Sequence, residues 1–106
     1  MSVSNECKYG DNIYIIENFV EPVIDINGLM SIDKSYEYRV GDKVTFLDWY
    51  YKSVEGNGYT FIKFKDTNGR TCTAVETYFA TEYVWNGLKR YFKLYFNNTL
   101  PDSKHS

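Results

Sequence analysis

Asparagine-glycine pairs occur four times in this sequence and indicate where the chain is expected to turn. Both residues adopt positive φ at low cost, so Asn-Gly between apolar alternating runs is the strongest short-range signal of a β-hairpin. Two further glycines, Gly10 and Gly41, precede aspartate and open the apolar runs at 12–16 and 43–47. The pattern predicts a series of short antiparallel strands. The four pairs are Asn27-Gly28, Asn57-Gly58, Asn68-Gly69 and Asn86-Gly87.

Composition supports a β fold. The 106 residues are 43% hydrophobic and 19% aromatic, which is too apolar for a disordered chain and typical of strands. We therefore predict an all-β fold, a single small barrel or sandwich of about eight short, mostly antiparallel strands. Residues 1–96 are expected to form one β domain. The polar residues 97–106 are expected to be a disordered tail.

The middle hairpin allows two registers. A two-residue loop would set Phe64 opposite Thr73, whereas a three-residue loop ending at Gly69 sets Phe64 opposite Cys72 and Ile62 opposite Ala74. The second register keeps apolar side chains together on one face, so we favour it. Residues 50–58 are predicted to be a longer connection before the strand at 59–65.

The last hairpin is predicted to turn at Asn86-Gly87. A two-residue loop there pairs Trp85 with Leu88 and divides the aromatic side chains between two faces. The first face is apolar and is expected to join the core. The second face is a candidate single-strand nucleic-acid surface, because rings can stack on bases while lysines hold phosphates. Its candidate contacts are Tyr78, Lys89, Tyr91, Lys93 and Tyr95, and the acidic Glu82 lies in the middle of the same face.

Residues 38–75 resemble part of an SH3-like small β-barrel. The matching features are the run from Val40 to Val44 that opens a strand, a variable loop, and a hairpin with Lys65-Asp66 before Asn68-Gly69-Arg70. The resemblance implies a small binding barrel with additions, since such barrels usually recognise peptides or nucleic acids. It covers about a third of the chain and carries over no functional residues.

Charge is unevenly distributed along the chain. The net charge of −2 argues against a protein that holds duplex DNA through many phosphate contacts. Residues 1–37 hold two lysines against seven acids, and residues 38–106 hold ten Lys and Arg against seven acids. This asymmetry fits either chance variation on a solvated surface or a bipolar molecule. Under the second interpretation, Glu17, Glu21 and Asp25 are candidate acidic contacts to a protein partner, and a nucleic-acid-mimicking patch is a further possibility.

Features of enzymes, metal sites and membrane proteins are scarce in the sequence. The single histidine is His105, in the predicted tail, and the two cysteines are too far apart in sequence to indicate a metal site. We expect no catalytic residues, no metal and no cofactor. No apolar run approaches 18 residues and the N-terminus lacks a signal pattern. A cytoplasmic protein with reduced thiols and no membrane contact is therefore expected.

The run Trp49-Tyr50-Tyr51 is the strongest candidate for a binding site. Consecutive strand residues point to opposite faces, so these three rings cannot all enter one core. Exposed Trp and Tyr are common in binding hot spots. We therefore expect these residues to contact a protein partner.

These observations favour a small, non-catalytic binding protein. Abundant Phe, Tyr, Ile, Asn and Lys with scarce Ala, Pro and Arg indicate an AT-rich coding sequence, as in many bacteriophages. The first hypothesis is thus a phage or mobile-element accessory protein that inhibits or redirects a host factor such as a defence nuclease. The alternatives are a single-stranded nucleic-acid-binding module and a viral structural or assembly component. The oligomeric state is left open.

Overall fold

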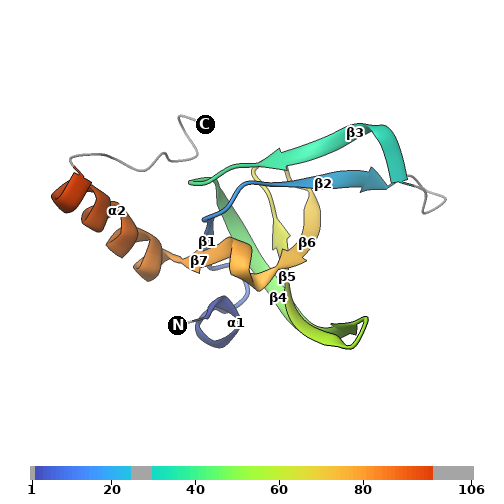
Figure 1. The fold of residues 1–106 in the computed structure, drawn as a ribbon, viewed down its shortest axis with the longest axis horizontal. Helices are drawn as coiled ribbons and strands as arrows, with labels where there is room; N and C mark the ends of the chain where they lie inside the picture. Colours follow the sequence, from blue (N-terminus) through green and yellow to red (C-terminus); the bar gives the residue numbers. More distant parts are fainter. Residues whose placement is uncertain (1, 25–29, 97–106) are drawn as a thin grey trace.

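The computed structural model describes residues 2–24 and 30–96. Within them, five strands form an antiparallel sheet in the order β6-β5-β4-β1-β7, and two more form a separate hairpin, β2-β3 (Figure 1). In chain order the elements are α1 (Val3–Glu6), β1 (Asn12–Ile15), β2 (Phe19–Ile24), β3 (Met30–Tyr38), β4 (Lys43–Val54), β5 (Asn57–Lys65), β6 (Thr71–Val75), the 3-10 helix η1 (Glu76–Tyr78), β7 (Phe79–Thr81) and α2 (Glu82–Phe96).

The prediction of a β fold is correct only in part. The chain is mostly β, but it ends in a helix, and β6 and β7 are the two edges of the larger sheet. No closed barrel forms among the residues that the structure describes. Figure 1 shows the β2-β3 hairpin crossing over the sheet, while α2 and the far end of the β4-β5 hairpin project from the body in different directions.

The core lies between the sheet and the β2-β3 hairpin. Alternate strand residues supply it, because side chains two apart share a face. Phe19 of β2 connects the two layers: its ring stacks on Tyr78 with centroids 4.7 Å apart and lies 5.0 Å from Tyr38. The fully buried side chains of the sheet within this core cluster are Ile13, Ile15, Ile62 and Phe64.

Both Gly-Asp pairs open strands as predicted. Gly10 has a φ of 91° and Gly41 a φ of 98°, conformations that favour glycine. In each turn the following aspartate accepts a bond at 2.9 Å from a backbone amide three residues earlier, Lys8 to Asp11 and Arg39 to Asp42. The two turns are therefore built alike, and β1 and β4 start directly after them.

The register of the middle hairpin is confirmed. Phe64 lies opposite Cys72 and Ile62 opposite Ala74, as the three-residue loop predicts. Gly69 has a φ of 83°, the left-handed conformation that a glycine bulge requires. Burial of Ile62 and Phe64 on one face explains why a slip by one residue is disfavoured.

The predicted long connection at 50–58 is wrong. β4 continues to Val54 and β5 begins at Asn57, with Val54 opposite Asn57. The turn is the two-residue loop Glu55-Gly56, whose φ values are 51° and 83°. Positive φ at both positions is typical of a type I′ hairpin turn, which matches the twist of the strands. Asn57-Gly58 is therefore the start of β5.

The predicted hairpin at Asn86-Gly87 is also wrong, because both residues lie inside α2. The Thr81 hydroxyl accepts a bond from the Val84 amide at 3.2 Å, a contact typical of a helix N-cap. Trp85 is then buried, with its ring stacked on Tyr14 at 5.6 Å. A helical cap and burial of Trp85 thus replace the expected strand pairing.

Three predictions fall on residues that the structure does not describe. Asp25 and Asn27-Gly28 lie within 25–29, and the predicted tail is 97–106. The sheet, the β2-β3 hairpin and α1 share one core cluster, to which Val3 of α1 contributes. Among the described residues, no helix is both long and apolar enough to cross a membrane.

Candidate functional site

The far half of the β4-β5 hairpin extends beyond its neighbours in the sheet. β1 pairs with residues 43–45 of β4, and β6 pairs with residues 61–65 of β5. Residues 48–60 therefore form a two-stranded ribbon whose outer edges pair with no other strand in the described part of the chain. Figure 1 shows this segment curving away from the body. We call residues 48–60 the aromatic ribbon.

One face of the aromatic ribbon continues the core face of the sheet. A bulge between Phe46 and Asp48 shifts the register by one residue, so that Trp49 lies opposite the buried Ile62. Tyr51 follows on the same face, opposite Thr60. The side chains lie beyond the core, and Trp49 is 45% exposed and Tyr51 67% exposed. The bulge therefore carries the apolar face of β4 out into solvent.

The opposite face of the aromatic ribbon is also lined with rings. Tyr50 lies opposite Phe61, and the two rings stack with centroids 5.3 Å apart. Tyr59 contacts Phe61 edge-on at 6.4 Å. Tyr50, Val54 and Tyr59 are all exposed. Trp49, Tyr50 and Tyr51 are thus all accessible, but on two faces of one ribbon.

Gly58 permits close packing within the aromatic ribbon. A Cβ at this position would overlap the Tyr51 ring, so the ring lies directly against the β5 backbone. A side chain there would displace Tyr51 from this position. The absence of a side chain at Gly58 therefore sets the orientation of one of the exposed rings.

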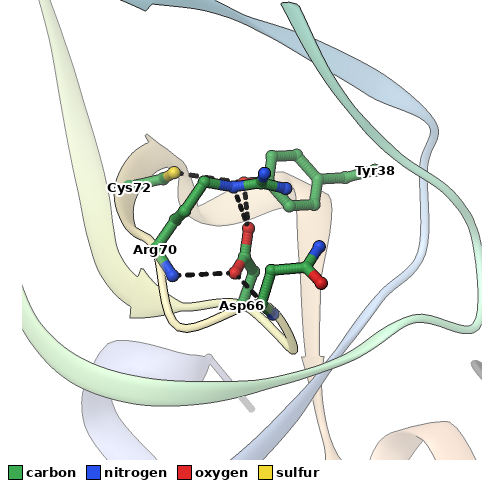
Figure 2. Close-up of polar contacts among 5 residues, drawn as sticks. Tyr38, Asp66, Arg70 and Cys72 are labelled. Carbon is green, nitrogen blue, oxygen red and sulfur yellow. Dashed lines mark hydrogen bonds and ion pairs between the residues drawn. The ribbon is translucent and has the colours of Figure 1, made fainter.

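A second cluster of interest is a polar network around the buried Asp66 (Figure 2). The Tyr38 hydroxyl and the Arg70 Nε each donate to Asp66 Oδ2 at 2.9 Å. The backbone amides of Asn68 and Arg70 donate to Oδ1, also at 2.9 Å. Four donors thus converge on one carboxylate, which joins the β5-β6 loop to the end of β3.

Protonation equilibria in this network follow from its hydrogen bonds. Burial alone would raise the pKa of Asp66, but the bonds from Arg70, Tyr38 and Asn68 lower it below its ordinary value. The pKa of Tyr38 is raised by burial and by its contacts with Cys72 and Asp66. Burial is also the main cause of the raised pKa of Cys72, whose Sγ lies 3.1 Å from the Tyr38 hydroxyl. Ionised Asp66 and neutral Tyr38 and Cys72 are therefore the favoured forms.

A polar hollow of about 400 Å³ lies beside this network. Its charged lining is balanced: Glu37, Asp42 and Asp66 against Arg39, Lys43 and Arg70. The Arg70 guanidinium also lies over the Tyr36 ring, 3.5 Å from its centroid. Because Asp66 and Arg70 bond to each other and to neighbouring elements, we assign the network to holding the loop in place.

The acidic residues singled out in the sequence lie apart from the aromatic ribbon. Glu17 is exposed and precedes β2, while Glu21 is half-buried within β2, where burial raises its pKa. Asp25 lies outside the described residues. Glu21 faces Tyr36 across the β2-β3 hairpin. The structure thus places Glu17 and Glu21 beside the other hairpin and does not join them to Trp49, Tyr50 and Tyr51.

The predicted face of tyrosines and lysines does not form on a strand. Tyr78 lies in η1 and stacks on Phe19. The other four residues lie on α2, where positions 89 and 93 share one side of the helix and positions 91 and 95 lie about 200° away at 100° per residue. The lysine positions and the tyrosine positions are therefore not side by side.

Cys7 and Cys72 are both free and half-buried. Burial, followed by the charges of Asp11 and Glu6, raises the pKa of Cys7, so neither thiol is activated as a nucleophile. In the part of the chain that the structure covers, no group of three or more His, Cys, Asp or Glu side chains could hold a metal ion.

Comparisons with known proteins leave the site to be interpreted from its own residues. No protein-family model, no curated protein and no solved structure matches this chain. Sequence reasoning missed Val54 and Tyr59 of the aromatic ribbon, and it missed Phe61, which stacks on Tyr50 at the start of the ribbon. The alternation in residues 59–65 places Tyr59 and Phe61 on one face, and this signal could have identified two of the three.

Proposed function

We propose that this protein is a small binding protein that acts through protein-protein contacts made by the aromatic ribbon. One observation carries the proposal. Five large apolar side chains on the ribbon are at least 40% exposed, and they lie on both faces of a segment that extends beyond the core. They are Trp49, Tyr50, Tyr51, Val54 and Tyr59.

An exposed ribbon of apolar rings is unfavourable for a protein that has no partner. Exposed apolar rings and open strand edges favour aggregation, and soluble proteins usually cover or charge them. Rings with few rotatable bonds bury a large area at low entropic cost when a partner covers them. Because residues 48–60 add little to the core, binding is the better explanation of their composition.

The finer biological and structural assignments are part of the same proposal. The described residues form an open sheet, so the proposal extends only to a relationship of residues 38–75 to part of an SH3-like fold. It is supported by the turn at Gly41 that opens β4 and by the β5-β6 hairpin with Asn68-Gly69-Arg70. The proposal includes a phage or mobile-element origin and a host target such as a defence nuclease. Both are supported only by an amino-acid composition that is typical of AT-rich coding sequences. Non-catalytic action is the accompanying expectation.

Capture of a partner from a bacterial lysate tests the proposal. Immobilised protein is compared with the double variant Trp49→Ser and Tyr51→Ser. We expect the unaltered protein to retain a partner in near-stoichiometric amount. The amount retained by the variant should be at least about tenfold lower, because each hot-spot ring contributes about 2 kcal/mol or more to binding.

The matched control is the double variant Tyr9→Ser and Tyr83→Ser, which removes two rings that are 79% and 76% exposed outside the aromatic ribbon. This control is expected to retain the partner. Equal loss in both variants, or no stoichiometric partner with the unaltered protein, would contradict the proposed function.

The nucleic-acid alternative is less well supported by the observed geometry. It depended on tyrosines and lysines that share a strand face, and residues 82–96 are helical instead. Lys89→Glu with Lys93→Glu nevertheless provides a direct check. If single-stranded oligonucleotides bound at low salt and this variant abolished the binding, the alternative would be favoured.

A further inference from the structure

The open edge of β4 carries outward-facing backbone groups along the aromatic ribbon. The Trp49 amide donates to the carboxylate of its neighbour, Asp48 Oδ1, at 2.8 Å. Val54 and Asn57 close the two-residue loop as a hydrogen-bonded pair, so Trp49, opposite Ile62, belongs to a non-hydrogen-bonded pair and its backbone groups face outward. Outward-facing residues alternate along an antiparallel strand, which gives Tyr51 and Ser53 the same orientation. Trp49, Tyr51 and Ser53 therefore form an edge that could accept another strand.

From this edge and its side chains, we infer that a second copy of the chain pairs with β4, antiparallel and centred on Tyr50. In that register Asp48 lies opposite Lys52 of the second copy, and Lys52 lies opposite Asp48 of the second copy. The segment Asp48-Trp49-Tyr50-Tyr51-Lys52 is thus complementary to itself in charge. Such a two-fold contact uses the same surface on both copies.

The same register is consistent with the backbone and with the rings. Trp49 lies opposite Tyr51 of the second copy, and both are outward-facing residues, as a hydrogen-bonded pair requires. Their rings share the face that continues the core face, where both are exposed. Cross-strand aromatic pairs and opposite charges each stabilise an antiparallel pair.

Neighbouring registers lack this complementarity. A shift by two residues in one direction places Lys52 opposite Tyr50 and Asp48 opposite Val54. A shift in the other direction places Asp48 opposite Tyr50 and Lys52 opposite Phe46. Only the register centred on Tyr50 pairs both charges, and this commits the proposal to one geometry.

Asp48 has a further role in this arrangement. In the single chain its carboxylate accepts a hydrogen bond from the Trp49 amide, which protects the open edge from unintended strand pairing. On pairing, the Trp49 amide would donate to the Tyr51 carbonyl of the second copy. The Asp48 carboxylate would then be available to form an ion pair with Lys52 of that copy. The overlap spans only five residues on each side, so the dimer is expected to be weak.

This inference rests on the proposed function in taking the aromatic ribbon as the binding surface, and it names a second copy as one partner. It is tested with purified protein by sedimentation velocity from about 10 µM to about 1 mM, the range of weak complexes. We expect a reversible monomer-dimer equilibrium for the unaltered protein.

Charge exchange tests the register. Lys52→Asp and Asp48→Lys are each expected to remain monomeric, because each places two like-charge pairs at the interface. An equimolar mixture of the two variants restores both opposite-charge pairs and is expected to dimerise. Lys65→Asp makes the same charge change as Lys52→Asp at an exposed site outside the overlap, and it is expected to dimerise like the unaltered protein.

Three results would overturn the inference: an unaltered protein that stays monomeric at about 1 mM, single-charge variants that dimerise normally, or a mixture that stays monomeric. The lysate experiment separates this failure from failure of the proposed function. If the protein is monomeric but still captures a partner through Trp49 and Tyr51, the dimer is excluded and the proposed function is retained. If substitution of these two rings leaves the capture of a partner unchanged, the proposed function is excluded.

Discussion

At the scale of single residues, Asp66 shows how much one side chain depends on distant partners. Two of its four donors, the amides of Asn68 and Arg70, are local to the loop. The Tyr38 hydroxyl comes from a residue 28 positions away. A run such as Asp66-x-Asn68-Gly69-Arg70 indicates a turn, but it cannot indicate burial or the bond from Tyr38. The role of Asp66 in joining β3 to the β5-β6 loop therefore became visible only in the fold.

Asp66→Asn is expected to lower the free energy of unfolding by about 1–3 kcal/mol at neutral pH, because the buried donors lose a charged acceptor. The folded pKa of Asp66 is lowered, so its contribution is present above the unfolded value of about 3.9 and is lost as pH falls through the folded pKa. The difference from the unaltered protein should thus shrink in acid. Urea unfolding at pH 7, 5 and 3 measures it.

The control for this substitution is Glu37→Gln. Glu37 pairs with Arg39 at 3.2 Å, but both side chains are more than 60% exposed. Such surface pairs contribute about 0–1 kcal/mol, so the change should be small. If the Asp66→Asn difference were constant from pH 7 to pH 3, the ionised carboxylate would not be its source.

At the scale of elements, two Asn-Gly pairs failed as turn signals for identifiable reasons. A loop at Asn57-Gly58 would place Lys52 opposite Lys63 and Tyr50 opposite Lys65. The observed loop instead places Asp48 opposite Lys63 and Tyr50 opposite Phe61. Opposite charges and stacked rings stabilise the observed register, whereas like charges directly opposite destabilise the alternative. Cross-strand pairing therefore outweighs the local preference of Asn-Gly.

The second failure is α2, where two periodicities compete in the same residues. Trp85, Leu88 and Phe92 have the spacing of one helix face, and Glu82 and Lys93 suit the ends of a helix. The Asn86-Gly87 pair favours a hairpin, and the predictions from the sequence included no helix here. A single glycine in a helix interior costs only about 1 kcal/mol, which is less than the burial of Trp85 provides.

Gly87→Ala distinguishes the helix from the hairpin. A Cβ at Gly87 would meet nothing within 4 Å, and the residue is exposed. Alanine should therefore raise the free energy of unfolding by about 0.5–1 kcal/mol, because it favours the helix. In an Asn-Gly hairpin turn, where φ is positive, the same change would be destabilising. Chemical denaturation gives the sign, and a loss of stability would contradict the helix.

At the scale of the whole molecule, the protein combines one small core with segments that extend away from it. The radius of gyration is 14.8 Å, against about 13 Å for a compact chain of about 100 residues. The aromatic ribbon and α2 both project from the body (Figure 1). A small core that presents extended, ring-bearing segments is consistent with a role in binding.

Trp85 is expected to be the main anchor of α2. It is 1% exposed, stacks on Tyr14 and has an indole N–H without a partner among the described residues. Trp85→Ala should lower the free energy of unfolding by about 3–5 kcal/mol, as for other buried aromatics. Tyr83→Ala, at a ring 76% exposed on the same helix, should change it by less than about 0.5 kcal/mol. Thermal unfolding monitored by circular dichroism compares the two variants. Equal effects would show that Trp85 is not the main anchor of α2.

Features that depend on neighbouring residues could be predicted before the fold was known. Alternation at 59–65 and 71–75, the left-handed glycine at 69 and the Gly-Asp turns at 10 and 41 led to correct strands and one correct register. Each depends on backbone sterics and on side chains two residues apart. The expectation that Trp49, Tyr50 and Tyr51 could not all be buried likewise follows from strand geometry alone.

Features that depend on contacts between distant residues required the folded chain. Residues 82–96 could satisfy either a hairpin or a helix locally, and the burial of Trp85 against Tyr14 favours the helix. The length of the β4-β5 hairpin depended on which side chains met across it. The exposure of its rings depended on where β1 and β6 stop pairing, because burial belongs to the assembled sheet and not to any one strand.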